Sequence, residues 1–310
     1  MTVIVEINKN VQFIRPAGKA VFPYCNSVFI NGDPSVLIDV GSGGRAYHQL
    51  RKQVDIVLLS HNHFDHINGI SFFPNAQVWA SREEAPGYQD ASVYASYNGY
   101  QHWEKLMGQP RKQRLAQTTV MPDDIPVQPG FIPIDLDGII DDGLKWDTGK
   151  EQIIALHTPG HSHGHYSFWL ESSGILFSGD IDLSPYGPWY GAENSDFDQL
   201  EASVRKLEQI DPAVLITSHR RMFKREEADI PQLLRDYLDI ALQKEHHVLE
   251  YLEKPRTFAD IADQPFISTY PTQTEHTKFW SRMMLLKHLK RLKAQGLIVE
   301  GEEGHWYRYR

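Results

Sequence analysis

The chain has 310 residues and a formal net charge of −9, and 41% of its residues are hydrophobic. This length suffices for a large core, in one large domain or two smaller ones. The acidic balance argues against a polyanion held by the general field of the molecule. No apolar run approaches the length of a membrane span and no basic leader is visible, so we expect a soluble, cytoplasmic protein without a membrane partner.

The single cysteine, Cys25, excludes an intramolecular disulfide. A lone cysteine is more often a small buried hydrophobe than a nucleophile. Any metal site would therefore use histidine and carboxylate ligands. This favours a catalytic site, because closed structural zinc sites usually recruit cysteine.

The first part of the chain is predicted to form short strands over residues 3–7, 11–14, 27–30 and 35–40. Asn-Gly and Asp-Pro steps mark the turn before the last of them. This strand carries Asp39 near its end, followed by glycines, where an acid is typical of a turn or a helix cap.

Four side chains that suit a metal follow the next predicted strand, residues 54–59. His61, His63, Asp65 and His66 fall within six positions, which is dense for a surface loop and too polar for a core. Alternate residues of an extended segment point the same way, so the first two can converge on one ion and the last two on a second. The pattern predicts two adjacent cations. A His-rich polar loop is the alternative, since the chain has 15 histidines.

The His-x-His-x-Asp-His motif after a strand resembles the signature of the metallo-β-lactamase superfamily. The resemblance implies an α/β fold, an αββα sandwich of two sheets covered by helices. It also implies that the remaining ligands come from strand-end loops far along the chain. A strand-end acid orients a ligand histidine in this family, so Asp39 is either that residue or an ordinary turn acid.

Residues 67–73 can begin a helix, and residues 76–80 form the next predicted strand. Over residues 81–128 the pattern loosens, as expected for an insertion into the sandwich. Its aromatic side chains either line a substrate pocket or, as is more common, pack internally. They are Tyr88, Tyr94, Tyr97, Tyr100 and Trp103.

Predicted strands at residues 131–140 and 152–156 lead to the segment 158–165, which matches the family motif T-P-G-H-[ST]-x-G-H. Its Pro-Gly turn can present His161 inward. The resemblance implies that His161 is the third histidine of the first metal. It also implies that His165 supports the site without binding metal.

A predicted hairpin, residues 166–171 and 174–177, ends before Gly179 and Asp180. The short arm of an aspartate and the close backbone approach that glycine allows suit a bridging ligand. The resemblance implies that Asp180 spans both ions. Asp182 has the same chemistry but no motif match, and we expect a supporting or solvated turn residue there.

A helix over residues 202–210 and a strand over 212–217 precede His219. The resemblance implies that this histidine closes the second metal. Its neighbours are larger than the small residues usual in the family, which leaves the pocket wall there undefined. Either of the two arginines that follow it meets an anionic substrate or, more commonly, is solvated or ion-paired.

From residue 231 the periodicity becomes helical, and the chain ends in a predicted hairpin over residues 297–309. Helices followed by a terminal hairpin resemble the small winged-helix-like domain attached to one branch of this superfamily. We therefore expect a metallo-β-lactamase-like catalytic domain, residues 1–230, and a helical, winged-helix-like domain, residues 231–310.

The charge of this second domain indicates whether it could bind nucleic acid. Residues 241–310 carry 11 Lys and Arg against 9 Asp and Glu, and the tip of the predicted hairpin carries Glu300, Glu302 and Glu303. A phosphate-binding wing should be basic, so nucleic acid is possible but not favoured. We expect a packing or homodimerisation appendage that shapes the active-site mouth.

The resemblance implies seven metal ligands in two groups. They are His61, His63 and His161, then Asp65, His66 and His219, with Asp180 shared. Two divalent ions, expected to be Zn²⁺ with Fe, Mn or Ni also compatible, would share a water, and the bridging hydroxide would be the nucleophile. Asp65, the acid closest to that water, would pass a proton to the leaving group.

Three function classes fit this site. Hydrolysis of a small ester, thioester or lactone is favoured, because the acidic body and the aromatic insertion suit an uncharged or partly apolar small molecule. The alternative is a ribonuclease or phosphodiesterase, since the branch with a winged appendage includes RNA-cutting members. A redox enzyme is disfavoured, because the di-iron oxidoreductases of the superfamily place Glu where His63 stands.

Overall fold

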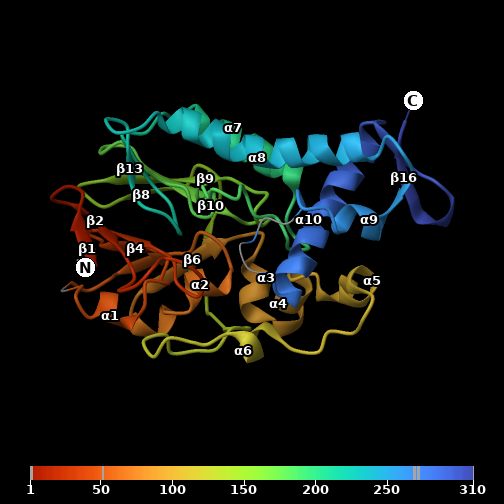
Figure 1. Cartoon of the computed structure of the whole chain (residues 1–310). Helices are drawn as coiled ribbons and strands as arrows, with labels where there is room; N and C mark the ends of the chain where they lie inside the picture. The colour runs from red at the N-terminus through yellow and green to blue at the C-terminus, as the bar shows by residue number, and fades with distance from the viewer. Residues whose placement is uncertain (1–2, 51, 268–269, 271–272, 310) are drawn as a thin grey trace.

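The computed structural model describes residues 3–50, 52–267, 270 and 273–309. Two β-sheets face each other, and helices cover their outer faces (Figure 1). Helices α1 (Gly44–Tyr47) and α2 (Phe64–Ile67) lie below the first sheet, and α7 (Phe197–Glu208) and α8 (Ile230–Tyr251) lie above the second. This is the αββα layering that the family resemblance implies.

The first sheet has its seven strands in sequence order, antiparallel from β1 to β4 and parallel from β4 to β7. The strands are β1 (Ile4–Glu6), β2 (Val11–Ile14), β3 (Ser27–Ile30), β4 (Val36–Ile38), β5 (Ile56–Leu58), β6 (Gln77–Ser81) and β7 (Gly138–Ile140).

The second sheet has the order β13-β12-β11-β10-β9-β8, and within it only β11 and β12 pair in parallel. The strands are β8 (Lys145–Asp147), β9 (Gln152–His157), β10 (Tyr166–Leu170), β11 (Ile175–Phe177), β12 (Val214–Ile216) and β13 (Phe223–Lys224). The short β8 and β13 were not predicted from the sequence.

Alternation along the strands builds the core on both faces of each sheet. In β3, Val28 and Ile30 face the second sheet, while Phe29 between them faces the helices below the first sheet. Phe168 and Phe177 meet Val28 and Ile30 from the second sheet. Each fully buried side chain of this kind stabilises the fold by about 1.5–3 kcal/mol, so the two sheets hold their strand ends in fixed positions.

The insertion between β6 and β7 consists of short helices. They are α3 (Ala85–Gln89), α4 (Ala91–Tyr97), η2 (Tyr100–His102), α5 (Trp103–Met107) and α6 (Leu115–Thr118). A separate turn, η1 (Ile70–Phe72), lies before β6. The predicted strand at 131–140 is wrong over residues 131–137, since only residues 138–140 pair, with β6. The predicted helix at 67–73 is also wrong in its bounds, because α2 begins at Phe64 and η1 is a separate turn.

The last part of the chain contains helix α8, then β14 (Arg256–Thr257), α9 (Phe258–Ala262), α10 (Glu275–Ala294), β15 (Ile298–Glu300), η3 (Glu302–Gly304) and β16 (His305–Arg308). Its three strands form a small sheet in the order β14-β16-β15. Helix α10 begins at Glu275, because the Thr274 side chain accepts a hydrogen bond from the Thr277 amide and caps it.

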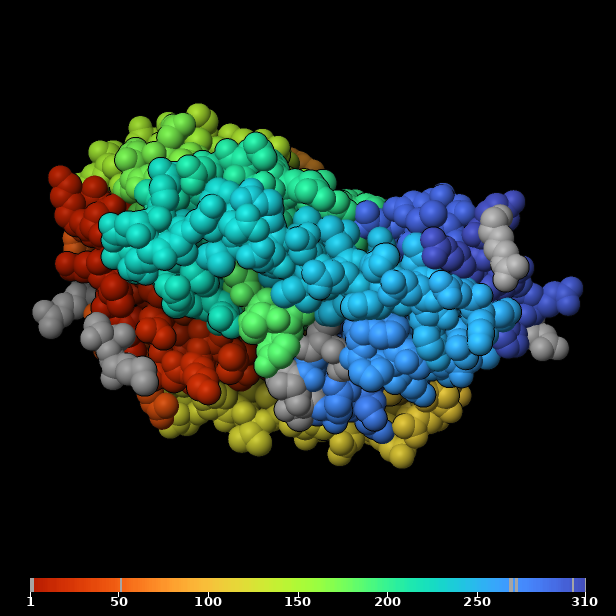
Figure 2. Space-filling model, turned by 45° about the horizontal axis from the view of Figure 1, so that its top comes forward, coloured from red at the N-terminus to blue at the C-terminus, as the bar shows by residue number. Residues whose placement is uncertain are grey.

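Helix α8 joins this region to the two-sheet body. Leu234 and Leu238 pack over the second sheet, whereas Val248 packs with Leu285 and Leu289 of α10. In Figure 2 the cyan surface of this helix is continuous with the body on one side and with the blue C-terminal region on the other. Among the described residues, none of the helices combines the length and the apolar character that a membrane crossing requires.

Candidate metal centre

Strand ends bring the predicted ligands to one place. His61 and His63 follow β5, His161 follows β9, Asp180 follows β11 and His219 follows β12. The carboxyl ends of the parallel pairs β4–β5 and β11–β12 lie at the same edge of the sandwich. All seven predicted ligands therefore meet, including Asp65 and His66 on the first turn of α2.

Asp180 lies between two groups of side chains. Its Oδ2 is 3.2 Å from Nε2 of His161 and 3.9 Å from Nε2 of His61. Its Oδ1 is 3.1 Å from Nε2 of His66 and 3.3 Å from Nε2 of His219. One carboxylate thus presents one oxygen to each group.

Hydrogen bonds on the far side of the rings fix which nitrogen has a free lone pair. His161 Nδ1 lies 3.0 Å from the carbonyl of Trp189, which can only accept, so Nδ1 carries the hydrogen. In the neutral ring, Nε2 then carries a free lone pair, and this atom lies 2.9 Å from Nδ1 of His63. Two ring nitrogens thus converge where a cation would bind both.

The second group repeats this arrangement. His66 Nδ1 donates to Oδ2 of Asp39 at 2.7 Å, so the ring turns its Nε2 toward the carboxylate of Asp180. Asp39 in turn accepts from the amide and the hydroxyl of Ser60 at 2.8 and 2.7 Å. Of the two interpretations of Asp39, the geometry favours the one in which it orients a histidine.

Buried polar atoms without a partner indicate that the cluster fits a metal. Within the described part of the chain, Nε2 of His61, Nε2 of His66 and Oδ1 of Asp180 are buried without a hydrogen-bond partner. Such atoms are costly unless something satisfies them. His61, His63, His161 and Asp180 offer ligand atoms within 4.8 Å of one another, and so do Asp65, His66 and His219. Nitrogen and oxygen donors of this kind suit divalent cations.

The comparisons with known proteins agree with this geometry. Residues 20–219, which include the whole cluster, match the family model of the metallo-beta-lactamase superfamily. The chain belongs to this superfamily of hydrolases. A probable metallo-hydrolase of Bacillus subtilis is 25% identical over 305 residues, which cover 89% of this chain and 90% of the relative.

Two further proteins extend the comparison. An atrochrysone carboxyl ACP thioesterase of Aspergillus fumigatus is 21% identical over 297 residues, covering 89% of this chain and 78% of that protein. A metallo-beta-lactamase family protein from Thermus thermophilus superposes with a TM-score of 0.72 at 20% identity, covering 98% of this chain and all of that one. The superposition shows that this chain shares the fold of that protein over nearly its whole length.

His165 differs from the three histidines of the first group, because hydrogen bonds within the chain use both of its ring nitrogens. Its Nδ1 donates to the carbonyl of Thr158 at 3.0 Å, and its Nε2 accepts from the amide of Asp180 at 3.0 Å. Both nitrogens are used, so the ring holds the Asp180 backbone in place and has no lone pair for a metal. Burial lowers the pKa of His165 to about 4, which keeps it neutral.

Electrostatics separate the two groups. Burial lowers the pKa of His63 to about 3 and also lowers the pKa values of His61 and His161, so these rings are neutral. Burial also acts to lower the pKa of His219, but the carboxylates of Asp180 and Asp65 outweigh it and raise that pKa to about 9. The acids therefore lie mainly beside the second group.

Four further residues of the kinds that bind metals or substrates are not among the seven predicted ligands. Asp182 lies at the cavity wall, where its Oδ1 accepts from the Ser184 amide, and burial raises its pKa to about 6. His163 accepts from Asn194 and donates to a carbonyl, facing away from the cluster. Arg221 pairs with Glu227 at 3.4 Å, as expected for an ion-paired arginine. Cys25 is buried, and burial raises the pKa of its thiol to about 12.

The cluster lies in a cavity of about 1250 Å³. Its walls come from the insertion, from the loop after β11 and from the first turns of α10. Three insertion aromatics, Tyr94, Tyr97 and Tyr100, line it, whereas Tyr88 and Trp103 are buried in packing. Of the five insertion aromatics, three therefore line the cavity and two pack internally.

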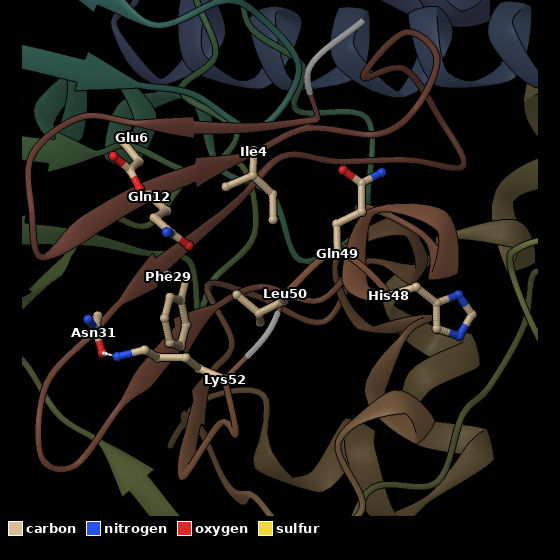
Figure 3. Close-up of a pocket in the computed structure, with 9 residues that line it drawn as sticks. All are labelled: Ile4, Glu6, Gln12, Phe29, Asn31, His48, Gln49, Leu50 and Lys52. Atoms are coloured by element: carbon tan, nitrogen blue, oxygen red, sulfur yellow. Dashed lines mark hydrogen bonds between the residues drawn. The ribbon is translucent and has the colours of Figure 1, made fainter.

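A second hollow, of about 630 Å³, lies among β1, β2, β3 and the residues after α1 (Figure 3). Its wall includes Lys52, which donates to Asn31 at 2.7 Å, and contains none of the seven clustered side chains. The cavity at the metal cluster is therefore the candidate active site.

Sequence reasoning did not identify two residues of the site. Trp189 contacts the rings of His63 and His161 at 5.3 and 5.2 Å, and its carbonyl orients His161. The buried carboxylate of Glu84 accepts from the Asn62 amide at 2.7 Å and so holds the backbone between the first two histidines. Trp189 lies in an irregular loop without periodicity; for Glu84, the only signal was an acid soon after a predicted strand.

Proposed function

We propose that this superfamily hydrolase is a dinuclear, metal-dependent enzyme acting on a small ester, thioester or lactone. The proposal rests on one observation, the carboxylate of Asp180 with one oxygen toward each histidine group. His61, His63 and His161 would hold one ion, Asp65, His66 and His219 the other, and Asp180 both. Zn²⁺ is proposed because neutral imidazole with carboxylate suits it.

Two divalent ions in such a site supply Lewis acidity, which lowers the pKa of water and polarises the carbonyl under attack. The side chains do the rest. Asp39 and the Trp189 carbonyl keep the lone pairs of His66 and His161 directed at the cluster. Asp65, whose Oδ2 is 3.4 Å from Nε2 of His219, takes a proton from the attacking water and gives it to the leaving group. The aromatic cavity walls exclude bulk water from this exchange.

A small-molecule substrate is supported over nucleic acid by what the basic residues of α10 contact. Arg291 pairs with Glu201 at 2.7 Å, Lys293 pairs with Glu300 at 2.9 Å, and Lys287 donates to the Ser195 carbonyl. These cations are engaged within the chain rather than presented as a phosphate-binding stripe. The thioesterase named among the relatives supports an ester or thioester substrate.

We further propose that residues 231–310 form a winged-helix-like domain. The order helix, strand, helix, helix, strand, strand and the small sheet β14-β16-β15 support this. The domain boundary, homodimer formation and cytoplasmic location stay predictions from the sequence.

The test begins with metal analysis of the purified protein, followed by chelation and re-metallation in a panel of lactones, thioesters, phosphodiesters and RNA. We expect carbonyl ester or thioester hydrolysis that disappears on chelation and returns with Zn²⁺ or another divalent ion. His63→Ala and Asp180→Asn should lose turnover and metal content, whereas His163→Ala should keep both. Activity that survives chelation, or hydrolysis confined to phosphodiesters, would contradict the proposal.

A further inference from the structure

The cavity wall contains a continuous file of aromatic rings that leads away from the metal cluster. His63 contacts Trp189 at 5.3 Å, and Trp189 contacts Trp280 of α10 at 6.0 Å between ring centroids. Trp280 contacts His276 at 5.9 Å, and His276 contacts Tyr100 of the insertion at 6.2 Å. Every member of the file lines the cavity, so the file joins the reaction centre to a distant part of the same space.

Packing of α10 against the insertion fixes this wall. Figure 1 shows α10 running from the C-terminal region down to the insertion. There Phe279 and Met283 pack with Trp103 and Leu106 of α5. The Phe279 and Trp103 rings stack at 4.8 Å. The wall is thus a packed element rather than a set of solvated side chains.

Arg111 lies at the distal end of the file. Its guanidinium carbon is 3.9 Å from the centroid of the Tyr100 ring, and the residue lines the cavity half-buried. Among the described residues, its guanidinium has neither an ion pair nor a hydrogen bond, whereas Arg282 and Arg291 pair with acids. Five N–H donors in a rigid fork are therefore available to a ligand.

The other charged side chains of the cavity wall determine the net charge at each end of the cavity. Glu275 also lines the cavity, and it accepts a hydrogen bond from Gln109 Nε2 at 3.2 Å. It lies on the first turn of α10, where the partial positive charge of the helix N-terminus offsets an acid. The acids Asp65, Asp180 and Asp182 lie at the metal end. The cavity thus has its acids at the end that would hold the metal ions, and at the other end it has Arg111, whose guanidinium has no ion pair among the described residues.

We propose that Arg111 binds an anionic group, a carboxylate or a phosphate, at the end of the substrate remote from the scissile bond. This inference rests on the proposed ester or thioester hydrolysis. The substrate class is a thioester or ester with an apolar segment that lies along the aromatic file and an anion that pairs with the guanidinium. A cavity of about 1250 Å³ exceeds the roughly 300–1,000 Å³ of most small-molecule pockets, which suits such an extended molecule.

A set of three thioesters with one acyl group tests the proposal and distinguishes its two sources of charge. N-acetylcysteamine gives a neutral thioester, glutathione a thioester with carboxylates, and phosphopantetheine a thioester with a phosphate. We expect one of the anionic thioesters to have the higher kcat/KM. Arg111→Gln should lower that value about 10–100-fold through KM, since charge-assisted hydrogen bonds are lost, and leave the neutral thioester unchanged.

Matched variants separate this contact from general charge effects. Lys112→Gln removes the same charge from an exposed neighbour that does not line the cavity, and it should leave all three thioesters unchanged. Glu275→Gln keeps the Gln109 hydrogen bond but removes the opposing charge, so it should lower KM for the anionic thioester. Equal rates for all three thioesters, or an equal loss on all three in Arg111→Gln, would overturn the proposal.

A binding measurement keeps the proposal testable if none of the thioesters is turned over, which would count against the proposed function instead. In calorimetry on the metal-loaded protein, we expect phenylhexanoate to bind at least about tenfold tighter than phenylhexanol. Arg111→Gln should abolish this difference and Lys112→Gln should retain it. A difference that is absent, or that persists in Arg111→Gln because the carboxylate binds elsewhere, would refute the role of Arg111.

Discussion

A buried hydrogen-bond chain ties the C-terminal region to the cluster of seven candidate ligands, and replacing His288 tests it. The His288 ring on α10 accepts from the Tyr190 hydroxyl at 2.7 Å and donates to Oε2 of Glu245 at 2.8 Å. Tyr190 follows Trp189, whose carbonyl orients His161. All three side chains of the chain are buried, so the carbonyl position depends on contacts made by the C-terminal helices.

His288→Ala removes both contacts and leaves two buried polar groups without partners. Each such group costs about 1–3 kcal/mol. Arg291 Nε lies 3.8 Å from Oε1 of Glu245 and compensates part of the second loss. We therefore expect the free energy of unfolding to fall by about 2–4 kcal/mol, measured by urea denaturation with far-UV circular dichroism.

The control is His246→Ala, on the exposed face of α8. His246 forms an i,i+4 pair with Glu250 at 3.2 Å, and 67% of its side chain is exposed, so a change below about 0.5 kcal/mol is expected. Because Tyr190 supports the Trp189 carbonyl, His288→Ala should also weaken Zn²⁺ binding, measured by competition with a chromophoric chelator. Stability and metal affinity within error of those of the His246 variant would refute the reasoning.

Three further outcomes follow from the geometry. Asp39→Asn removes the carboxylate that accepts from His66 Nδ1, and metal affinity should fall about 10–100-fold in the same chelator competition. Gly179→Ala would place a Cβ 2.4 Å from His165 Nε2 at a φ of +59°, so both the unfolding free energy and the bound metal, measured by denaturation and elemental analysis, should fall. Burial lowers the folded-state pKa of His288, so the unfolded chain binds the proton more readily. Stability should therefore drop as pH falls below about 6.5, with a smaller drop in His288→Gln when urea midpoints are compared between pH 7 and 5.

The candidate ligand set could be predicted because its signals are local. His61, His63, Asp65 and His66 follow one strand within six positions, and strand ends are where a sandwich exposes polar side chains. Asp180 was predictable in the same way, from an acid placed after a buried strand and a glycine. Their convergence in space came from the family resemblance, since spacing along the chain does not tell which strand ends meet.

Other parts depended on contacts that the sequence does not display. Ile132, Ile134 and Leu136 alternate as in a strand and do face the core. Alternation reports which side is buried, but a strand also needs a neighbour, and this segment instead donates from the Ile134 amide to the Tyr88 carbonyl. Trp189 shows the same limit, because an irregular loop has no period from which its direction could be read.

The C-terminal region contributes residues to the wall of the candidate active-site cavity and also packs beside it. Trp280 of α10 contacts Trp189, and Trp189 contacts His63 and His161. Helix α8 contributes to the core above the second sheet and to the core of the C-terminal region. Deleting residues 231–310 would therefore expose the apolar surface of the sheet and open the cavity at once. Loss of activity in such a truncation would carry no information on substrate recognition, whereas point substitutions on the cavity side of α10 change recognition while both cores stay packed.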